Sequence, residues 1–483
     1  MSLSARIRAL EATARSLEPN AAQRAHLLQH VVGYAQQFLR NLDQAPAYVA
    51  SAENGRGLLT SPPTEEGIGI EEALRLLQEN VDTPGINPAS GRFLGYIPGG
   101  GLFPAALGDF LAAVANRYAG VFFASPGAVR MENMLVDWMG DLIGYPAARG
   151  GTLTSGGSIG NLVAIVSARD ARGIAGEAVS SAVVYLTEET HHSVEKALRI
   201  AGLGSCVLRR VPLDEGYRMD PAALATSVTR DAAAGLRPWL VVASAGSTNT
   251  GAVDPLPAIA RIAHDNGLWF HVDGAYGAFF ALCEEGRAIL QGMEHSDSIV
   301  LDPHKGLFLP YGTGAVLVRE RPALLAAHQY LADYMQDATV APEELSPADL
   351  SPELTRHFRG LRLWLPLKLF GLAPFRAALE EKMLLARYFY DQIQEVPGFV
   401  AGPPPDLSVV VFRYLPPQGD ADAFNRRLVE ALQQDGRVFL SSTRLEGNFV
   451  LRAAILSFRT HLEDVDRAVA TLAEKAQALQ ARA

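Results

Sequence analysis

Lys305 is the residue of this sequence whose chemistry stands out most. It follows the apolar run 298–301, and the chain has few other lysines. Only five of its 42 Lys and Arg residues are lysine: Lys196, Lys305, Lys368, Lys382 and Lys475. A lysine amine, unlike a guanidinium, can lose its proton in an apolar site and form an imine with an aldehyde. We therefore favour imine chemistry at Lys305 over a surface lysine in a turn.

A carboxylate ends another apolar run, 32 residues before Lys305. Asp273 closes the segment "LWFHVD" and is followed by the small residues Gly274 and Ala275. A buried carboxylate is costly unless it meets a cation or hydrogen-bond donors. Asp273 is thus a candidate partner for a protonated ring nitrogen, and the alternative is a cap for the next helix.

Two further motifs offer an anion site and an imidazole. The segment 155–158, "SGGS", precedes a helical run, where backbone amides can approach a phosphate. The same letters also suit a tight loop with Ser158 as a helix cap. His191 and His192 follow a predicted strand, and an imidazole there can stack on a flat ring. As neighbours they lack the i, i+4 spacing of a zinc motif, so we predict no metal.

Together these four features match the needs of one cofactor. Pyridoxal 5'-phosphate (PLP) requires a phosphate cradle, an aromatic or imidazole ring to stack on, an acidic partner for its ring nitrogen and an imine-forming lysine. The conjunction is far more specific than any one motif, and it predicts PLP as the cofactor.

The surrounding elements are predicted to place these residues at one edge of a sheet. Six apolar, β-branched runs alternate with helical segments: 182–187, 206–211, 239–245, 268–273, 298–302 and 314–319. This pattern indicates a parallel sheet covered on both faces, whose ligands bind at the carboxyl ends of the strands. We predict an N-terminal helical arm (1–94), a large cofactor-binding domain (95–370) and a small α+β domain (371–483).

The charge and the cysteine content indicate which partners and which cellular compartment to expect. The net charge of −10 leaves no basic field for nucleic acid or an anionic membrane, so the expected partner is a small molecule. No apolar run approaches the ~20 residues that span a bilayer. Two cysteines give no disulfide framework, and the N-terminus lacks the apolar core of a signal peptide. We expect a cytoplasmic protein.

The motifs "TSGGSIGNL", "THHSVEKA", "HVDGAYG" and "DPHKG" carry a resemblance to a known family. Over about 91–460 the chain resembles the group II PLP-dependent amino-acid decarboxylases, which include the aromatic-L-amino-acid, histidine and glutamate decarboxylases. The resemblance implies the α/β architecture of fold type I, with a mainly parallel central sheet flanked by helices. It also implies decarboxylation of an L-amino acid, aromatic or otherwise apolar, to the amine and carbon dioxide.

The resemblance assigns roles to residues. Lys305 is expected to hold PLP as an internal aldimine, Asp273 to keep the ring nitrogen protonated, and His191 to stack on the ring. The remaining expected cofactor contacts are Gly157, Ser158, Thr248, Ala275 and His304. The expected catalytic residues are Lys305, His191, His304 and Asp273. Family members are homodimers with shared active sites, so the same is expected here.

Two departures from the family leave alternatives open. Animal-type members carry a proton-donating tyrosine on a loop, but 340–359 contains none; Tyr330 and Tyr334 lie earlier. In the family, that loss is associated with oxidative formation of an aldehyde. The alternatives are therefore an aldehyde synthase, a carbon–carbon lyase of the same fold, or a non-catalytic PLP-binding homologue.

The second departure concerns the expected substrate pocket. Gly99–Gly101 stand where aromatic-acid decarboxylases tend to have Thr and Ser, and these glycines could open room for a larger substrate. Tyr96 and Phe103 keep the aromatic character of an apolar pocket. Arg130 is expected to form a structural ion pair rather than to meet a second substrate carboxylate.

Overall fold

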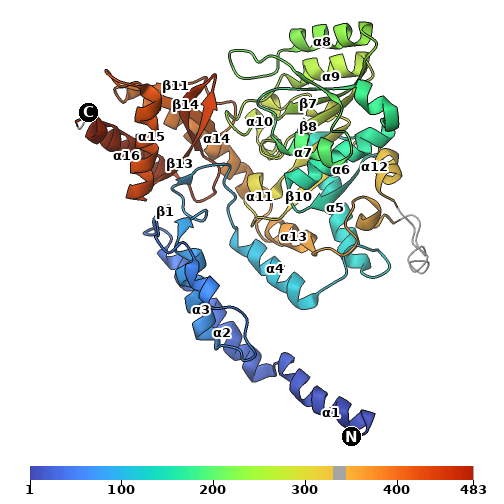
Figure 1. The fold of residues 1–483 in the computed structure, drawn as a ribbon, viewed down its shortest axis with the longest axis vertical. Helices are drawn as coiled ribbons and strands as arrows, with labels where there is room; N and C mark the ends of the chain where they lie inside the picture. The colour runs from blue at the N-terminus through green and yellow to red at the C-terminus, as the bar shows by residue number, and fades with distance from the viewer. Residues whose placement is uncertain (330–343, 482–483) are drawn as a thin grey trace.

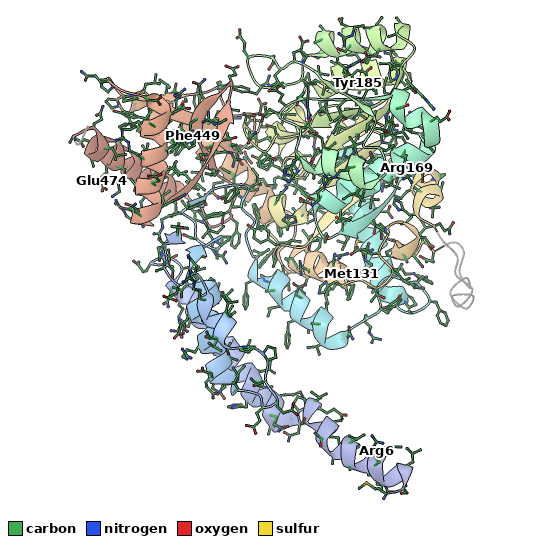
Figure 2. The ribbon with its side chains drawn as sticks, viewed as in Figure 1. Arg6, Met131, Arg169, Tyr185, Phe449 and Glu474 are labelled. Atoms are coloured by element: carbon green, nitrogen blue, oxygen red, sulfur yellow. The ribbon has the colours of Figure 1, made fainter. Side chains whose placement is uncertain are left out.

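The computed structural model describes residues 1–329 and 344–481. Its N-terminal arm (residues 3–86) extends away from the rest of the molecule (Figure 1). The arm contains the helices α1 (Leu3–Ala14), α2 (Ala21–Asn41) and α3 (Ile70–Leu77), and the paired strands β1 (Tyr48–Val49) and β2 (Gly85–Ile86). None of the three helices has a buried residue, and side chains such as Arg6 project into solvent (Figure 2).

A seven-stranded sheet forms the centre of the larger part of the molecule, in the order β4-β10-β9-β8-β7-β5-β6. Its strands are β4 (Gly150–Thr154), β5 (Ala182–Leu186), β6 (Val207–Arg210), β7 (Arg237–Ser244), β8 (Trp269–Asp273), β9 (Ser298–Leu301) and β10 (Gly314–Val318). Strand β10 runs antiparallel to both of its neighbours, and the pairings among β5 to β9 are parallel. The mainly parallel sheet expected from the sequence is confirmed, with one reversed strand.

Helices cover both faces of this sheet. One face packs against α5 (Pro126–Ile143), α8 (Pro221–Ala233) and α9 (Leu256–Asp265), and the other against α6 (Gly157–Ala171), α7 (Ser193–Ile200) and α12 (Arg321–His328). In β8, Phe270 and Val272 belong to the first core, whereas Trp269 belongs to the second. Because alternate side chains enter opposite cores, the strands are apolar throughout.

The C-terminal part is a second α/β layer pair. Helices α14 (Ala373–Glu395), α15 (Ala421–Asp435) and α16 (Leu462–Gln480) pack on a five-stranded sheet. The strands of that sheet, in order, are β11 (Phe399–Ala401), β12 (Val409–Tyr414), β14 (Asn448–Ala454), β13 (Phe439–Leu445) and β3 (Phe93–Leu94). Strand β3, which the sequence places at the end of the arm, pairs parallel with β13. It therefore ties the start of the large part to the C-terminal sheet.

Two helices connect these parts. Helix α4 (Phe103–Ala115) packs against α13 (Arg359–Phe370). The sequence suggests a helix over 105–120, but α4 ends at Ala115 because Asn116 adopts a left-handed conformation, with φ of 45°. No helix in the described ranges is long and apolar enough to cross a membrane.

Candidate active site

A cavity of about 300 Å³ lies at the carboxyl ends of the sheet strands. Its walls come from the segments that follow β4, β5, β7, β8 and β9, which is where ligands bind in sheets of this kind. All eight residues predicted to contact a cofactor line it: Gly157, Ser158, His191, Thr248, Asp273, Ala275, His304 and Lys305. The fold thus gathers into one cavity residues that are far apart in the sequence.

Lys305 lies on α11 (Pro303–Gly306), a one-turn helix directly after β9. Its Nζ atom is 3.1 Å from Oδ2 of Asp302, and its side chain is 24% exposed. Asp302 is buried, and its Oδ1 atom has no hydrogen-bond partner among the described residues. The amine therefore has an anionic neighbour and access to the cavity. Sequence reasoning missed Asp302, although it ends an apolar strand just as Asp273 does.

Asp273 is held by two donors. Its Oδ1 accepts the backbone N–H of Ala275 at 3.2 Å, and its Oδ2 accepts an amide hydrogen from Asn161 at 3.0 Å. Asn161 lies in the second turn of α6 and is buried. The two donors therefore hold the Asp273 carboxylate in place at the cavity. Asn161 was also missed, although it stands in the quoted motif "TSGGSIGNL".

A chain of buried groups extends from the Asn161 amide into the core. Because a carboxylate only accepts, the Asn161 NH₂ group faces Asp273, and its Oδ1 atom faces His271. His271 Nε2 then carries the proton and donates to Asn161 Oδ1 at 2.9 Å. Burial lowers the pKa of His271, so its ring is neutral. His271 Nδ1 is therefore an acceptor, so the Ser298 hydroxyl donates to it at 2.9 Å, while Ser298 Oγ accepts from Trp269 Nε1 at 2.8 Å.

The same amide reaches His191. Asn161 also donates to Ser193 Oγ at 2.9 Å, and that oxygen lies 2.7 Å from His191 Nδ1. The Ser193 backbone N–H donates to the same Nδ1 atom at 3.3 Å, so Nδ1 is an acceptor and the ring proton is on Nε2. Burial is the main cause that lowers the pKa of His191. His191 is therefore a neutral ring in the cavity wall, as a stacking role requires.

A glycine cradle lies at the N-terminus of α6. A Cβ on Gly157 would lie 2.9 Å from Asp302 Oδ2 and 3.1 Å from the Cβ of Ala275, so only glycine fits there. Gly156 has a φ of 152°, and a Cβ added there would lie 3.4 Å from His304 Cε1. Nδ1 of His304 donates to the Thr313 carbonyl at 2.7 Å, and burial lowers the pKa of this histidine.

These groups match the chemistry of PLP. Free backbone amides at the first turn of α6 suit a phosphate, the Asp273 carboxylate suits a protonated ring nitrogen, and the Lys305 amine suits an aldehyde. The residues present therefore fit the expected cofactor.

Two charged residues outside the quoted motifs contribute to the site, one in the cavity wall and one behind it. Glu189 lines the cavity, accepts a hydrogen bond from Asn249 at 3.2 Å, and has its pKa raised by burial. Arg452 on β14 donates to the carbonyls of Thr248 and Asn249, and so fixes the loop after β7. Burial lowers the pKa of Arg452 to about 10. Its role was not visible in the sequence because it acts across two sheets.

The predicted substrate residues Tyr96 and Phe103 do not line this cavity. They are 57% and 40% exposed, and their place in a substrate pocket stays a prediction. Arg130 forms an ion pair with Glu344 at 2.9 Å, as expected of a structural role. Tyr330 and Tyr334 lie outside the described residues.

Two of the glycines at 99–101 pack closely against the segment that carries Lys305. A Cβ on Gly99 would lie 2.7 Å from the His304 carbonyl oxygen, and one on Gly100 would lie 2.7 Å from the Cβ of Phe308. Gly99 and Gly100 therefore allow close packing against the lysine-bearing segment. That these glycines open room for a larger substrate stays a prediction.

Comparisons with known proteins agree with the geometry. Residues 70–415 match the pyridoxal-dependent decarboxylase conserved domain. Over 415 residues the chain is 34% identical to an aromatic-L-amino-acid decarboxylase of Bacillus atrophaeus, covering 85% of this chain and 86% of that protein. It is 30% identical over 401 residues to a phenylacetaldehyde synthase of Arabidopsis thaliana, covering 80% and 82%. The crystal structure of Oryza sativa TDC with PLP and tryptamine superposes with a TM-score of 0.89 at 28% identity, covering 95% and 99%.

Proposed function

We propose that this chain, which belongs to the family of pyridoxal-dependent decarboxylases, releases carbon dioxide from an aromatic or otherwise apolar L-amino acid and yields the amine. Membership of the family makes it a PLP-dependent carboxy-lyase that acts on an amino acid. The aromatic preference is supported by its similarity to the aromatic-L-amino-acid decarboxylase of B. atrophaeus.

The convergence of Lys305, Asp273 and His191 on one cavity carries this proposal. When bound, PLP supplies an electron sink for the pair released with carbon dioxide. Lys305 would hold the cofactor through its amine, which can form an imine with an aldehyde. Asp273, anionic and held by Asn161, keeps a proton on the ring nitrogen. The neutral His191 ring packs on the cofactor face and carries its proton on Nε2.

An aldehyde product is the second candidate. Two observations favour it: the absence of tyrosine from 340–359, and the similarity to a phenylacetaldehyde synthase. That reaction consumes one oxygen and one water per amino acid, and releases carbon dioxide, ammonia, hydrogen peroxide and the aldehyde. The two products therefore differ in a measurable co-product.

Product analysis tests both candidates. Protein loaded with PLP is incubated with L-phenylalanine, L-tyrosine or L-tryptophan, and the amine, aldehyde and peroxide are quantified. Amine without peroxide supports the first proposal, whereas aldehyde with equimolar peroxide supports the second. Lack of turnover with the whole panel would contradict both and favour a lyase or a non-catalytic homologue.

We also propose that the chain forms a homodimer with shared active sites. Helix α4 presents apolar side chains that are 43–69% exposed in the single chain: Leu107, Phe110, Leu111 and Val114. Exposed apolar patches of this kind mark interaction surfaces, and the extended arm offers further contact area. Tyr96 and Phe103 are exposed nearby in sequence, so in such a dimer they can reach the partner's cavity. Sedimentation of a fully active monomer would contradict this.

The cytoplasm is the proposed compartment. Cys206 and Cys283 are both free and buried, which suits a reducing environment. Fractionation of cells that express the protein tests this, and recovery from a secreted fraction would contradict it.

A further inference from the structure

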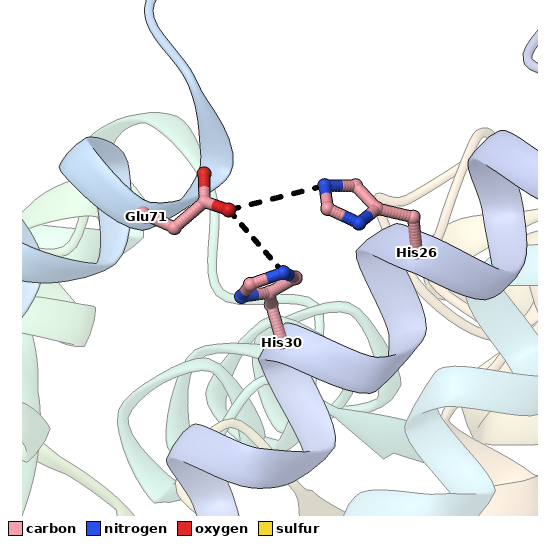
Figure 3. Close-up of side chains that lie close together, drawn as sticks. All are labelled: His26, His30 and Glu71. Carbon is pink, nitrogen blue, oxygen red and sulfur yellow. Dashed lines mark ion pairs between the residues drawn. The ribbon is translucent and has the colours of Figure 1, made fainter.

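Three metal-ligating side chains meet on the N-terminal arm, outside the cavity described above. His26 and His30 are four residues apart on α2, so both imidazoles lie on one face of that helix. Glu71 projects from the first turn of α3 towards both rings (Figure 3). We propose that these three residues bind a Zn²⁺ ion that links α2 to α3.

The distances suit a tetrahedral ion. Glu71 Oε1 lies 3.3 Å from His30 Nε2 and 4.0 Å from His26 Nε2, and ligand atoms of all three residues lie within 4.8 Å of one another. Two ligands bound to tetrahedral zinc at 2.0–2.1 Å are themselves about 3.4 Å apart. The Glu71–His30 spacing already matches this value, and the Glu71–His26 spacing exceeds it by about 0.6 Å. The rings meet edge to face, with centroids 4.5 Å apart, and Nε2 of each ring lies within 4.0 Å of the same Glu71 oxygen.

The charges around the trio favour a cation. Glu71 has no ion pair with lysine or arginine among the described residues, because the nearby Arg75 pairs with Glu72 and Glu79. Two imidazoles and one carboxylate form a donor set that zinc uses with water in the fourth position. Magnesium and calcium prefer oxygen ligands, so the set selects a transition metal over either ion.

Such an ion would act on the stability of the arm. Helices α2 and α3 bury no residue in the single chain, and the segment that joins them contains paired prolines and no α-helix. A metal bond between them closes this loop, which limits the motion of both helices. All three ligands lie on the arm, so zinc binding there does not depend on the activity proposed above.

Calorimetric titration of tag-free, chelator-treated full-length protein with Zn²⁺ tests the site. We expect one ion per chain, no heat with Mg²⁺, and at least tenfold weaker zinc binding in His30→Ala and in Glu71→Gln. His264→Ala is the matched control, because His264 is an exposed histidine 3.3 Å from a carboxylate, that of Asp265, but has no third ligand. It should leave the titration unchanged.

Hydrogen exchange supplies a second readout. Zinc should slow amide exchange in 21–41 and 70–77 of the unmodified protein and have no effect in the His30→Ala variant. Absence of stoichiometric zinc binding would overturn the proposal. Binding that survives both His30→Ala and Glu71→Gln would also overturn it, because the ion would then be held elsewhere.

Discussion

Asn161 donates a hydrogen bond to Asp273 across 3.0 Å and accepts one from His271, which lies two residues before Asp273. Asn161 lines the cavity, and behind it His271, Ser298 and Trp269 continue the hydrogen bonds into the core. Interior polar groups of this kind are costly unless every member is paired. We infer that these hydrogen bonds hold the side chains of Asp273 and His191 in place.

Asn161→Ala should weaken PLP binding. The change leaves a buried oxygen of Asp273 without its side-chain donor, at a cost of about 1–3 kcal/mol, which corresponds to a roughly 5- to 150-fold rise in the dissociation constant. Fluorescence titration of the apoprotein with PLP measures it. Ser167→Ala is the control. Ser167 is buried on the same helix, but its hydroxyl bonds to the Val163 carbonyl and lies 3.4 Å from His328 Nε2, away from Asp273. Equal affinities in both variants would show that Asp273 is positioned without Asn161.

Lys305→Arg should abolish turnover as completely as Lys305→Ala. An arginine keeps the positive charge beside Asp302 but cannot deprotonate to form an imine. Turnover and the absorbance of bound PLP are measured together, with Lys368→Ala as the control because Lys368 is exposed on α13. Retained activity in Lys305→Arg would mean that the residue acts only through its charge.

Gly157→Ala should impair both the cradle and the fold. The added methyl group meets Asp302 Oδ2 and the Ala275 Cβ, and overpacking at such a site costs about 1–3 kcal/mol. Urea denaturation of the apoprotein and PLP titration report the two effects. Gly127→Ala is the matched control: Gly127 also lies in the first turn of a helix, and its added Cβ meets nothing within 4 Å. A Gly157→Ala protein as stable as the control would refute the close packing.

His271 should make stability depend on pH. Burial lowers its pKa in the folded state, so below about pH 6.5 the unfolded chain takes up a proton that the folded chain refuses. The stabilisation is complete above that pH and is lost as the pH falls. Between about pH 7.5 and 5.5, the free energy of unfolding should therefore fall less in His271→Gln than in the unmodified protein. If urea titrations give the same decrease in the free energy of unfolding for both proteins, His271 is not a buried neutral residue.

The sequence predicted the type of most elements and the mainly parallel sheet, but not the reversed direction of β10. All six strands expected in the large part are present, because runs buried on both faces are apolar throughout. Strand β4 was missed because Gly150 and Gly151 suggest a loop; Gly151 lies so close to the Val316 carbonyl that a Cβ would approach it to 2.6 Å. The spacing of apolar residues shows which faces of a strand are buried, but it does not show the direction in which the strand runs. The reversal of β10 could therefore not be predicted from it.

The candidate site was predictable where a residue ends a strand or begins a helix. Lys305, Asp273 and Gly157 occupy such positions, and the sheet brings them together. Asn161 and His271 act from the interior of a helix and a strand, where the sequence gives an asparagine or histidine no distinctive context. Their roles follow only from the three-dimensional packing.

Release of labelled carbon dioxide tests the central claim most directly. Unmodified protein and Lys305→Ala, both loaded with PLP, are incubated with carboxyl-labelled L-phenylalanine, L-tyrosine and L-tryptophan, and the released label is trapped and counted. Decarboxylation at Lys305 predicts release by the unmodified protein from at least one of these substrates, and none above background by the variant. Equal release by both proteins, or none by a PLP-loaded unmodified protein, would contradict it.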